Sequence, residues 1–163
     1  MLRKLFIIWL LVMPAYLQIT AQPINNKNEL PPFTLQLTNG SIVSYKTLSQ
    51  KKPVILIYFA PGCEHCREFI KKLVGKIKLF EQAQIVLVSY FPLADLQKFS
   101  TEFKLDQLSN VKVGTEGNSF RVPALFKIVK FPFTAVYNKL GRLTAIFREE
   151  PSLNVLSDLL KKQ

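Results

Sequence analysis

The chain has 163 residues, 48% of them hydrophobic, and a formal net charge of +11. This length suits one domain with a full core and is short for two. Its basic residues are scattered along the chain, so the charge favours a solvated basic surface suited to acidic partners and argues against a nucleic-acid partner.

The first 21 residues are typical of a secretory signal. A basic start precedes an apolar run over residues 5–13, and the small-residue exit at Ala21 predicts cleavage after that residue. The alternative is an uncleaved membrane anchor, but a span needs about 20 apolar residues, and Pro14 and Gln18 interrupt this run. We therefore expect a monomer exported to a bacterial periplasm or an equivalent space, with no stable membrane insertion after cleavage.

Residues 22–32 are polar and rich in proline, which predicts a flexible lead-in to a domain over residues 33–163. Apolar and polar residues alternate on both sides of Asn39-Gly40, a pattern that predicts a β-hairpin. Residues 54–59 form a continuous apolar run of β-branched and aromatic side chains. Such a run indicates a strand buried on both faces at the centre of a sheet.

From Cys66 to Phe80, apolar side chains recur on one helical stripe, which predicts a helix. Residues 85–88 form a second buried strand, and Pro92 opens a helical pattern that continues to Phe103.

We expect a loop through Gly114 and Gly117, then one helical turn over residues 123–128. Residues 133–147 read as an antiparallel hairpin, and an amphipathic helix closes the chain. These elements together describe a mixed β-sheet covered by helices on both faces.

The chain has only two cysteines, Cys63 and Cys66, placed where a strand gives way to a helix. A disulfide that closes so short a loop adds little stability, so the pair is better explained by reactivity. Unpaired peptide N–H groups and the helix dipole stabilise a thiolate at a helix start. Cys63 is therefore the expected nucleophile, and Cys66, one turn further in, is the expected resolving thiol.

The segment from Phe59 to Cys66, the N-terminal hairpin and the later Phe131-Pro132 resemble the thioredoxin superfamily, in particular its secreted branch with an extra N-terminal hairpin. The resemblance implies an α/β thioredoxin-like fold, with a central mixed β-sheet flanked by helices. It also implies thiol–disulfide oxidoreductase activity on protein thiols and disulfides, a redox partner protein, and no cofactor or metal. A cis-proline at Pro132 would face the dithiol and pair its neighbouring backbone with the client, and Phe131 would form an apolar wall.

Several positions depart from the pattern of thioredoxins proper. Ile57 stands where thioredoxins have a buried aspartate, and Gly62 stands where they have tryptophan. The residues between the cysteines are Glu64 and His65, two candidates for tuning the thiolate. A histidine in this place resembles the disulfide isomerase and oxidant members, and predicts a higher reduction potential than Gly-Pro would give. Glu64 opposes this effect, because its negative charge disfavours a neighbouring thiolate.

The same residues also fit other hypotheses. The cysteines could be half of a zinc site, but tetrahedral zinc takes four ligands and His65 is the one further typical ligand. They could also form an inert disulfide in a non-catalytic binding module built on the thioredoxin scaffold. A peroxidase of related fold would want a hydroxyl residue at Ala60. His65 could be a solvated loop residue, and Pro132 could be an ordinary trans proline.

Overall fold

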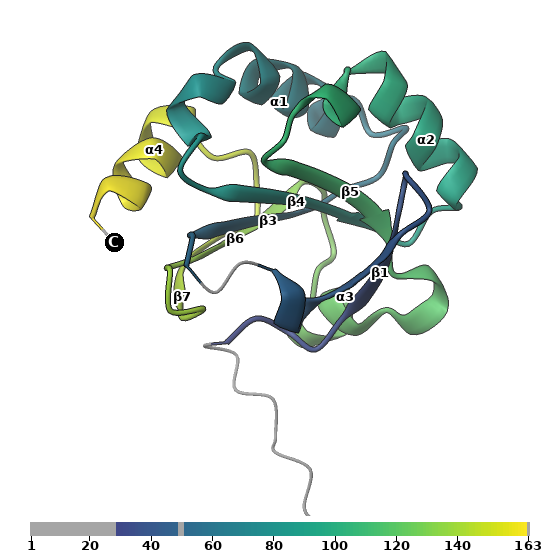
Figure 1. The fold of residues 1–163 in the computed structure, drawn as a ribbon, viewed down its shortest axis with the longest axis horizontal. Coiled ribbons are helices and arrows are strands. Elements are labelled where there is room, and N and C mark those ends of the chain that lie inside the picture. Colours follow the sequence, from purple (N-terminus) through teal and green to yellow (C-terminus); the bar gives the residue numbers. More distant parts are fainter. Residues whose placement is uncertain (1–28, 49–50, 163) are drawn as a thin grey trace, which may run out of the picture.

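A computed structural model of the protein describes residues 29–48 and 51–162 (Figure 1). The predicted signal and residues 22–28 of the predicted lead-in lie outside the described residues. The last part of that lead-in, residues 29–32, packs on the domain. Glu29 forms an isolated β-bridge with Arg142, and Leu30 is buried among core side chains.

The centre of the domain is a seven-stranded mixed sheet with the strand order β2-β1-β5-β4-β3-β6-β7. Its strands are β1 (Thr34–Leu37), β2 (Ile42–Ser44), β3 (Val54–Tyr58), β4 (Gln84–Ser89), β5 (Val111–Thr115), β6 (Phe133–Tyr137) and β7 (Leu143–Phe147). The three strands β3, β4 and β5 run parallel, and all other pairings are antiparallel. The carboxyl ends of β3, β4 and β5 therefore meet at one edge of the sheet, where sites of α/β proteins form.

Within residues 29–48 and 51–162, four α-helices cover this sheet: α1 (Glu64–Gly75), α2 (Leu93–Glu102), α3 (Arg121–Phe126) and α4 (Leu153–Lys161). Figure 1 shows α1, α2 and α4 over one face and α3 under the other. Each face has its own hydrophobic cluster, and strand β3 supplies side chains to both because all five of its residues are buried. The predicted mixed sheet between helical layers is confirmed. No helix in the described part of the chain has the length and apolar character needed to cross a membrane.

The prediction of a loop through Gly114 is wrong, because this glycine lies in strand β5, between β4 and β1. Glycine has a low strand propensity, so the pattern around it did not indicate a strand. The structure gives the reason for the glycine. A Cβ atom at Gly114 would lie 2.9 Å from the Gln36 carbonyl oxygen and 2.9 Å from Leu37 Cδ2. The close approach of β1 therefore requires a residue without a side chain.

The helix after Cys66 is also shorter than its apolar stripe predicts. Helix α1 ends at Gly75, and residues Ile77–Phe80 form a separate 3₁₀ turn. Glycine is a poor helix former, and the backbone N–H of Lys76 closes the helix on the carbonyl oxygens of Leu73 and Val74. Phe80 is nevertheless fully buried, so the turn continues the core-facing surface of α1.

Candidate active site

The site begins where β3 leaves the sheet and turns into α1. Cys63 is the N-cap residue of this helix, with an extended backbone (φ −79°, ψ 117°). Its N–H donates to the carbonyl oxygen of Ala60 at 3.0 Å, which closes the turn, and its own carbonyl accepts the N–H of Arg67 at 3.0 Å. The central strand and the first turn of the helix thus fix the backbone of Cys63 on both sides.

The two cysteines are free thiols in different surroundings. The sulfur of Cys63 takes the place of a capping oxygen, because it accepts the backbone N–H of Cys66 at 3.4 Å. Cys63 is half-buried and Cys66 is fully buried. Cys63 is therefore accessible to solvent, whereas the Cys66 thiol is not.

Burial of Cys66 has an electrostatic consequence. Loss of hydration, with a smaller contribution from a hydrogen bond to the Cys63 sulfur, raises the pKa of the Cys66 thiol to about 12. Side chains around Cys66 belong to the apolar cluster under α1, which includes Phe59, Phe69 and Ile70. At neutral pH this thiol is protonated, so it is a poor first nucleophile.

The segment before β6 lies opposite the first cysteine. The peptide bond between Phe131 and Pro132 is cis. The thiol of Cys63 donates to the carbonyl oxygen of Phe131, with 3.9 Å between sulfur and oxygen. Pro132 is buried and Phe131 is half-buried. The chain thus brings together two segments that are 68 residues apart in the sequence.

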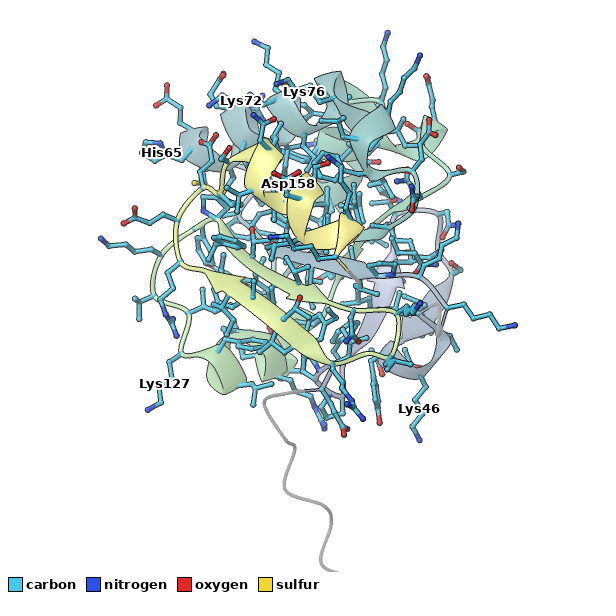
Figure 2. The ribbon with its side chains drawn as sticks, turned by 90° about the vertical axis from the view of Figure 1, so that its left-hand side faces the viewer. Lys46, His65, Lys72, Lys76, Lys127 and Asp158 are labelled. Carbon is cyan, nitrogen blue, oxygen red and sulfur yellow. The ribbon has the colours of Figure 1, made fainter. Side chains whose placement is uncertain are left out.

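The residues between the cysteines are both exposed, in the first turn of α1. Figure 2 shows the His65 side chain at the edge of the molecule, pointing away from the sheet. With Phe131 and Pro132, His65 lines a groove of about 380 Å³. Glu64 makes no hydrogen bond or ion pair within the described residues. The tuning roles of Glu64 and His65 remain predictions.

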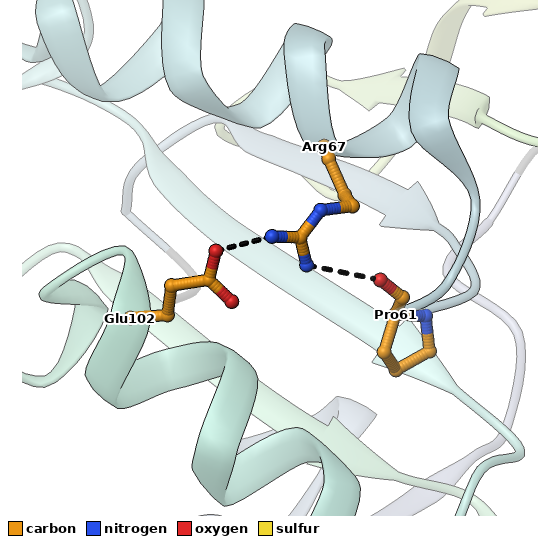
Figure 3. Close-up of polar contacts among 3 residues, drawn as sticks. All are labelled: Pro61, Arg67 and Glu102. Carbon is orange, nitrogen blue, oxygen red and sulfur yellow. Dashed lines mark hydrogen bonds and ion pairs between the residues drawn. The ribbon is translucent and has the colours of Figure 1, made fainter.

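Arg67, the residue that follows Cys66, lies at a polar position of the helical pattern. In the structure its guanidinium bridges two elements (Figure 3). It donates to the carbonyl oxygen of Pro61 at 3.4 Å and pairs with Glu102 at the end of α2. It also lies over the rings of Phe99 and Phe103, at 5.8 and 5.2 Å from their centroids. Arg67 therefore connects the turn before Cys63 with α2 through side-chain contacts.

A second polar group near the site is Glu116, which is buried and accepts the phenolic hydroxyl of Tyr58 at 2.7 Å. No local pattern indicated this pair, because 58 residues separate its members. Ile57, at the position of the aspartate of thioredoxins, is fully buried and pairs with Thr134 of β6. The described residues contain no group of three or more potential metal ligands.

The chain is similar to one protein family and to several solved structures. The AhpC/TSA family matches over residues 27–131. A search of curated protein sequences finds no match.

Three similar solved structures share this architecture. One is a secreted disulfide oxidoreductase of Mycobacterium tuberculosis, homologous to DsbE of E. coli, with 18% identity, a TM-score of 0.66, and coverage of 81% of this chain and 96% of that one. Another is the thioredoxin domain of a thiol-disulfide oxidoreductase from Bacteroides vulgatus, with 22% identity, a TM-score of 0.67, and coverage of 83% and 95%. The third is the peroxidoxin BcpB of M. tuberculosis, with 18% identity, a TM-score of 0.65, and coverage of 82% and 92%. These similarities confirm the predicted thioredoxin-like fold.

Proposed function

We propose that this chain, which belongs to the AhpC/TSA family, is an exported thiol–disulfide oxidoreductase that exchanges disulfides through Cys63 and Cys66. One observation carries the proposal: the two thiols share a helix start, but one is accessible and the other is buried with a raised pKa. Cys63 is reachable and accepts a peptide N–H, while Cys66 is buried and its pKa is raised to about 12. This asymmetry is what a nucleophile and a resolving thiol require.

The chemistry runs in two steps. The Cys63 thiolate attacks one sulfur of a client disulfide, the client S–S bond breaks, and the departing client thiolate takes up a proton. Cys66 then loses its proton to solvent and attacks the Cys63 sulfur, which releases the second client thiol. The client disulfide gains two electrons and two protons, and the protein dithiol becomes a disulfide. Run in reverse, the same steps oxidise a client dithiol.

The setting of the reaction is part of the proposal. The signal-like first 21 residues support an exported protein, and two proteins of similar structure are oxidoreductases, one of them secreted. Protein thiols or disulfides would be the substrates, and a second redox protein would restore the starting state. The backbone beside Pro132, which faces Cys63, would pair with the client chain as an added strand.

Mixed-disulfide trapping tests the proposal. The reduced protein and its Cys63→Ser and Cys66→Ser variants are mixed with glutathione disulfide, quenched with acid and weighed by mass spectrometry. We expect the Cys66→Ser variant to hold one glutathione on Cys63, because the resolving thiol is missing. The wild type should proceed to the internal disulfide, and the Cys63→Ser variant should react slowly, since burial protects Cys66.

Two results would contradict the proposal. One is a Cys63→Ser variant that reacts as fast as the wild type, because Cys66 would then be the accessible thiol. The other is a wild-type disulfide that stays closed in mild reductant, as expected of a non-catalytic binding module.

A further inference from the structure

Aromatic rings form a partly exposed surface beside the reactive sulfur, which we call the aromatic ledge and define as Tyr90, Phe91, Phe120 and Phe131. The ring of Tyr90 lies 4.7 Å from Phe91, 5.4 Å from Phe120 and 6.5 Å from Phe131, measured between centroids. Phe120 is 44% exposed and Tyr90 is 36% exposed. The carbonyl of Phe131 accepts the Cys63 thiol, so the ledge starts at the reactive sulfur and extends away from it.

The outer end of the ledge has an unusual backbone. Phe120 adopts the left-handed conformation, with φ 45° and ψ 30°. A residue with a Cβ atom is rarely found there, because the side chain crowds the backbone. Such strain persists only where the surrounding structure imposes it, and it concentrates at functional positions. An exposed ring gains little from folding that would offset this strain.

A buried carboxylate imposes the conformation. Glu116 accepts four hydrogen bonds, and three of them come from residues on either side of Phe120. One oxygen accepts the Ser119 hydroxyl at 3.1 Å and the backbone N–H groups of Arg121 and Val122 at 3.0 and 3.3 Å. The other accepts the hydroxyl of Tyr58, a fully buried residue of the central strand. The loop that presents Phe120 is therefore anchored in the sheet.

From these observations we infer that Phe120 and Tyr90 bind an apolar side chain of the client polypeptide, close to the client's reactive cysteine. The inference rests on the proposed function. Formation of the mixed disulfide brings the client sulfur into bonding distance of Cys63, so the residues that flank it must lie over the adjoining surface. On the Phe120 side that surface is aromatic, and a partly exposed aromatic surface gains from covering by an apolar group. The ledge thus makes Phe120 and Tyr90 specificity-determining residues.

The test uses two peptide disulfides that differ in one respect. Each is a disulfide-linked homodimer of a short peptide that contains one cysteine. In the first peptide the two residues on each side of the cysteine are leucine, and in the second peptide they are serine. Reduced protein is mixed with each, quenched with acid, and the second-order rate constant is obtained by mass spectrometry. We expect the wild type to prefer the leucine peptide about tenfold, a usual size for discrimination by an apolar site.

Three variants separate the ledge from other effects. Phe120→Gly and Tyr90→Ala should lower the preference to about threefold or less. Leu140→Ala is the matched control, because Leu140 is an exposed apolar residue (69%) in the turn between β6 and β7. It should keep the full preference. Glutathione disulfide has no apolar side chain to place on the ledge, so each variant's rate with it is the reference to which that variant's two peptide rates are compared.

Phe120→Gly also shows whether the ring serves the fold. Glycine adopts the left-handed conformation without steric cost, so the variant should melt no lower than the wild type. A marked loss of stability would overturn the inference, as would a wild type without preference or variants that retain it. If the wild type does not react with glutathione disulfide at all, the result contradicts the proposed function itself and not only this inference.

Discussion

Replacing Arg67 by alanine should loosen the turn that presents Cys63. The guanidinium contacts the carbonyl of Pro61 before the site and, on α2 and its C-cap, Glu102 and the rings of Phe99 and Phe103. Alanine removes all of these contacts together and leaves the polypeptide backbone of α1 unchanged. We therefore expect a loss of both stability and exchange rate.

The expected loss can be estimated contact by contact. The side chains of Arg67 and Glu102 are 37% and 52% exposed, so their ion pair contributes at most about 1 kcal/mol. The hydrogen bond to Pro61 is long, at 3.4 Å, and contributes about 0.5–1 kcal/mol. Stacking on two phenylalanine rings adds about 0.5–1 kcal/mol. The total is about 1–3 kcal/mol in the free energy of unfolding, which for a domain of this size lowers Tm by about 3–10 °C.

Urea and thermal unfolding of the reduced protein measure this loss, and the rate of reaction with glutathione disulfide measures the effect on Cys63. Glu102→Gln is the control, since it removes one ion pair and should cost less than about 1 kcal/mol. Arg67→Lys keeps the charge but lacks the planar fork that reaches two acceptors, so it should behave like alanine in the exchange assay. An Arg67→Ala variant with wild-type stability and rate would refute the role given to this residue.

Three further predictions concern single positions. The folded pKa of Cys66 is raised, so its contribution to stability is present below pH 9 and is lost as the pH rises toward 12. Between pH 8 and 10 the free energy of unfolding in urea should fall by about 1.4 kcal/mol more for the reduced wild type than for Cys66→Ala. Equal losses would contradict the raised pKa of Cys66. Gly114→Ala should lower the free energy of unfolding by about 1–3 kcal/mol, because β1 leaves no room for a methyl group. Gly75→Ala has open space around it and should leave the free energy of unfolding unchanged. Equal Tm values for the two variants would be evidence against this packing. His65→Pro should lower the reduction potential by about 10–20 mV, since proline lacks the imidazole N–H that can stabilise the thiolate of the reduced form, and an unchanged potential would mean that the imidazole does not act on the sulfur.

The elements that formed a strong local pattern could be predicted from the sequence. Strand β3 has five buried residues in a row and reads as a central strand, and the junction after it places Cys63 at a helix start. The capping geometry of the Cys63 sulfur follows from that junction. The final hairpin and helix were equally clear, because Asn138 to Gly141 separate two apolar runs.

The features that depend on distant contacts could not be predicted. Strand β5 has no clear strand pattern in the sequence, because Gly114 is required by the neighbouring strand β1 rather than by its own segment. Arg67 lies at a polar position of an amphipathic helix, and its contacts with Glu102 and the Phe99 ring come from α2, a separate element of the chain. Glu116 and Tyr58 meet across the sheet edge, 58 residues apart. In each case the tertiary arrangement, and not the local sequence, determines what the residue does.

The most direct test of the account is the reduction potential of the Cys63–Cys66 pair. The protein is equilibrated with glutathione buffers of graded composition, quenched with acid, alkylated and weighed, so that the fractions of dithiol and disulfide are counted. A thiol–disulfide oxidoreductase should give one two-electron transition between about −270 and −120 mV, the range between thioredoxin and a strong oxidant. A reduction potential below about −300 mV, as structural disulfides have, would contradict this function. A pair of cysteines that never forms a disulfide would also contradict it.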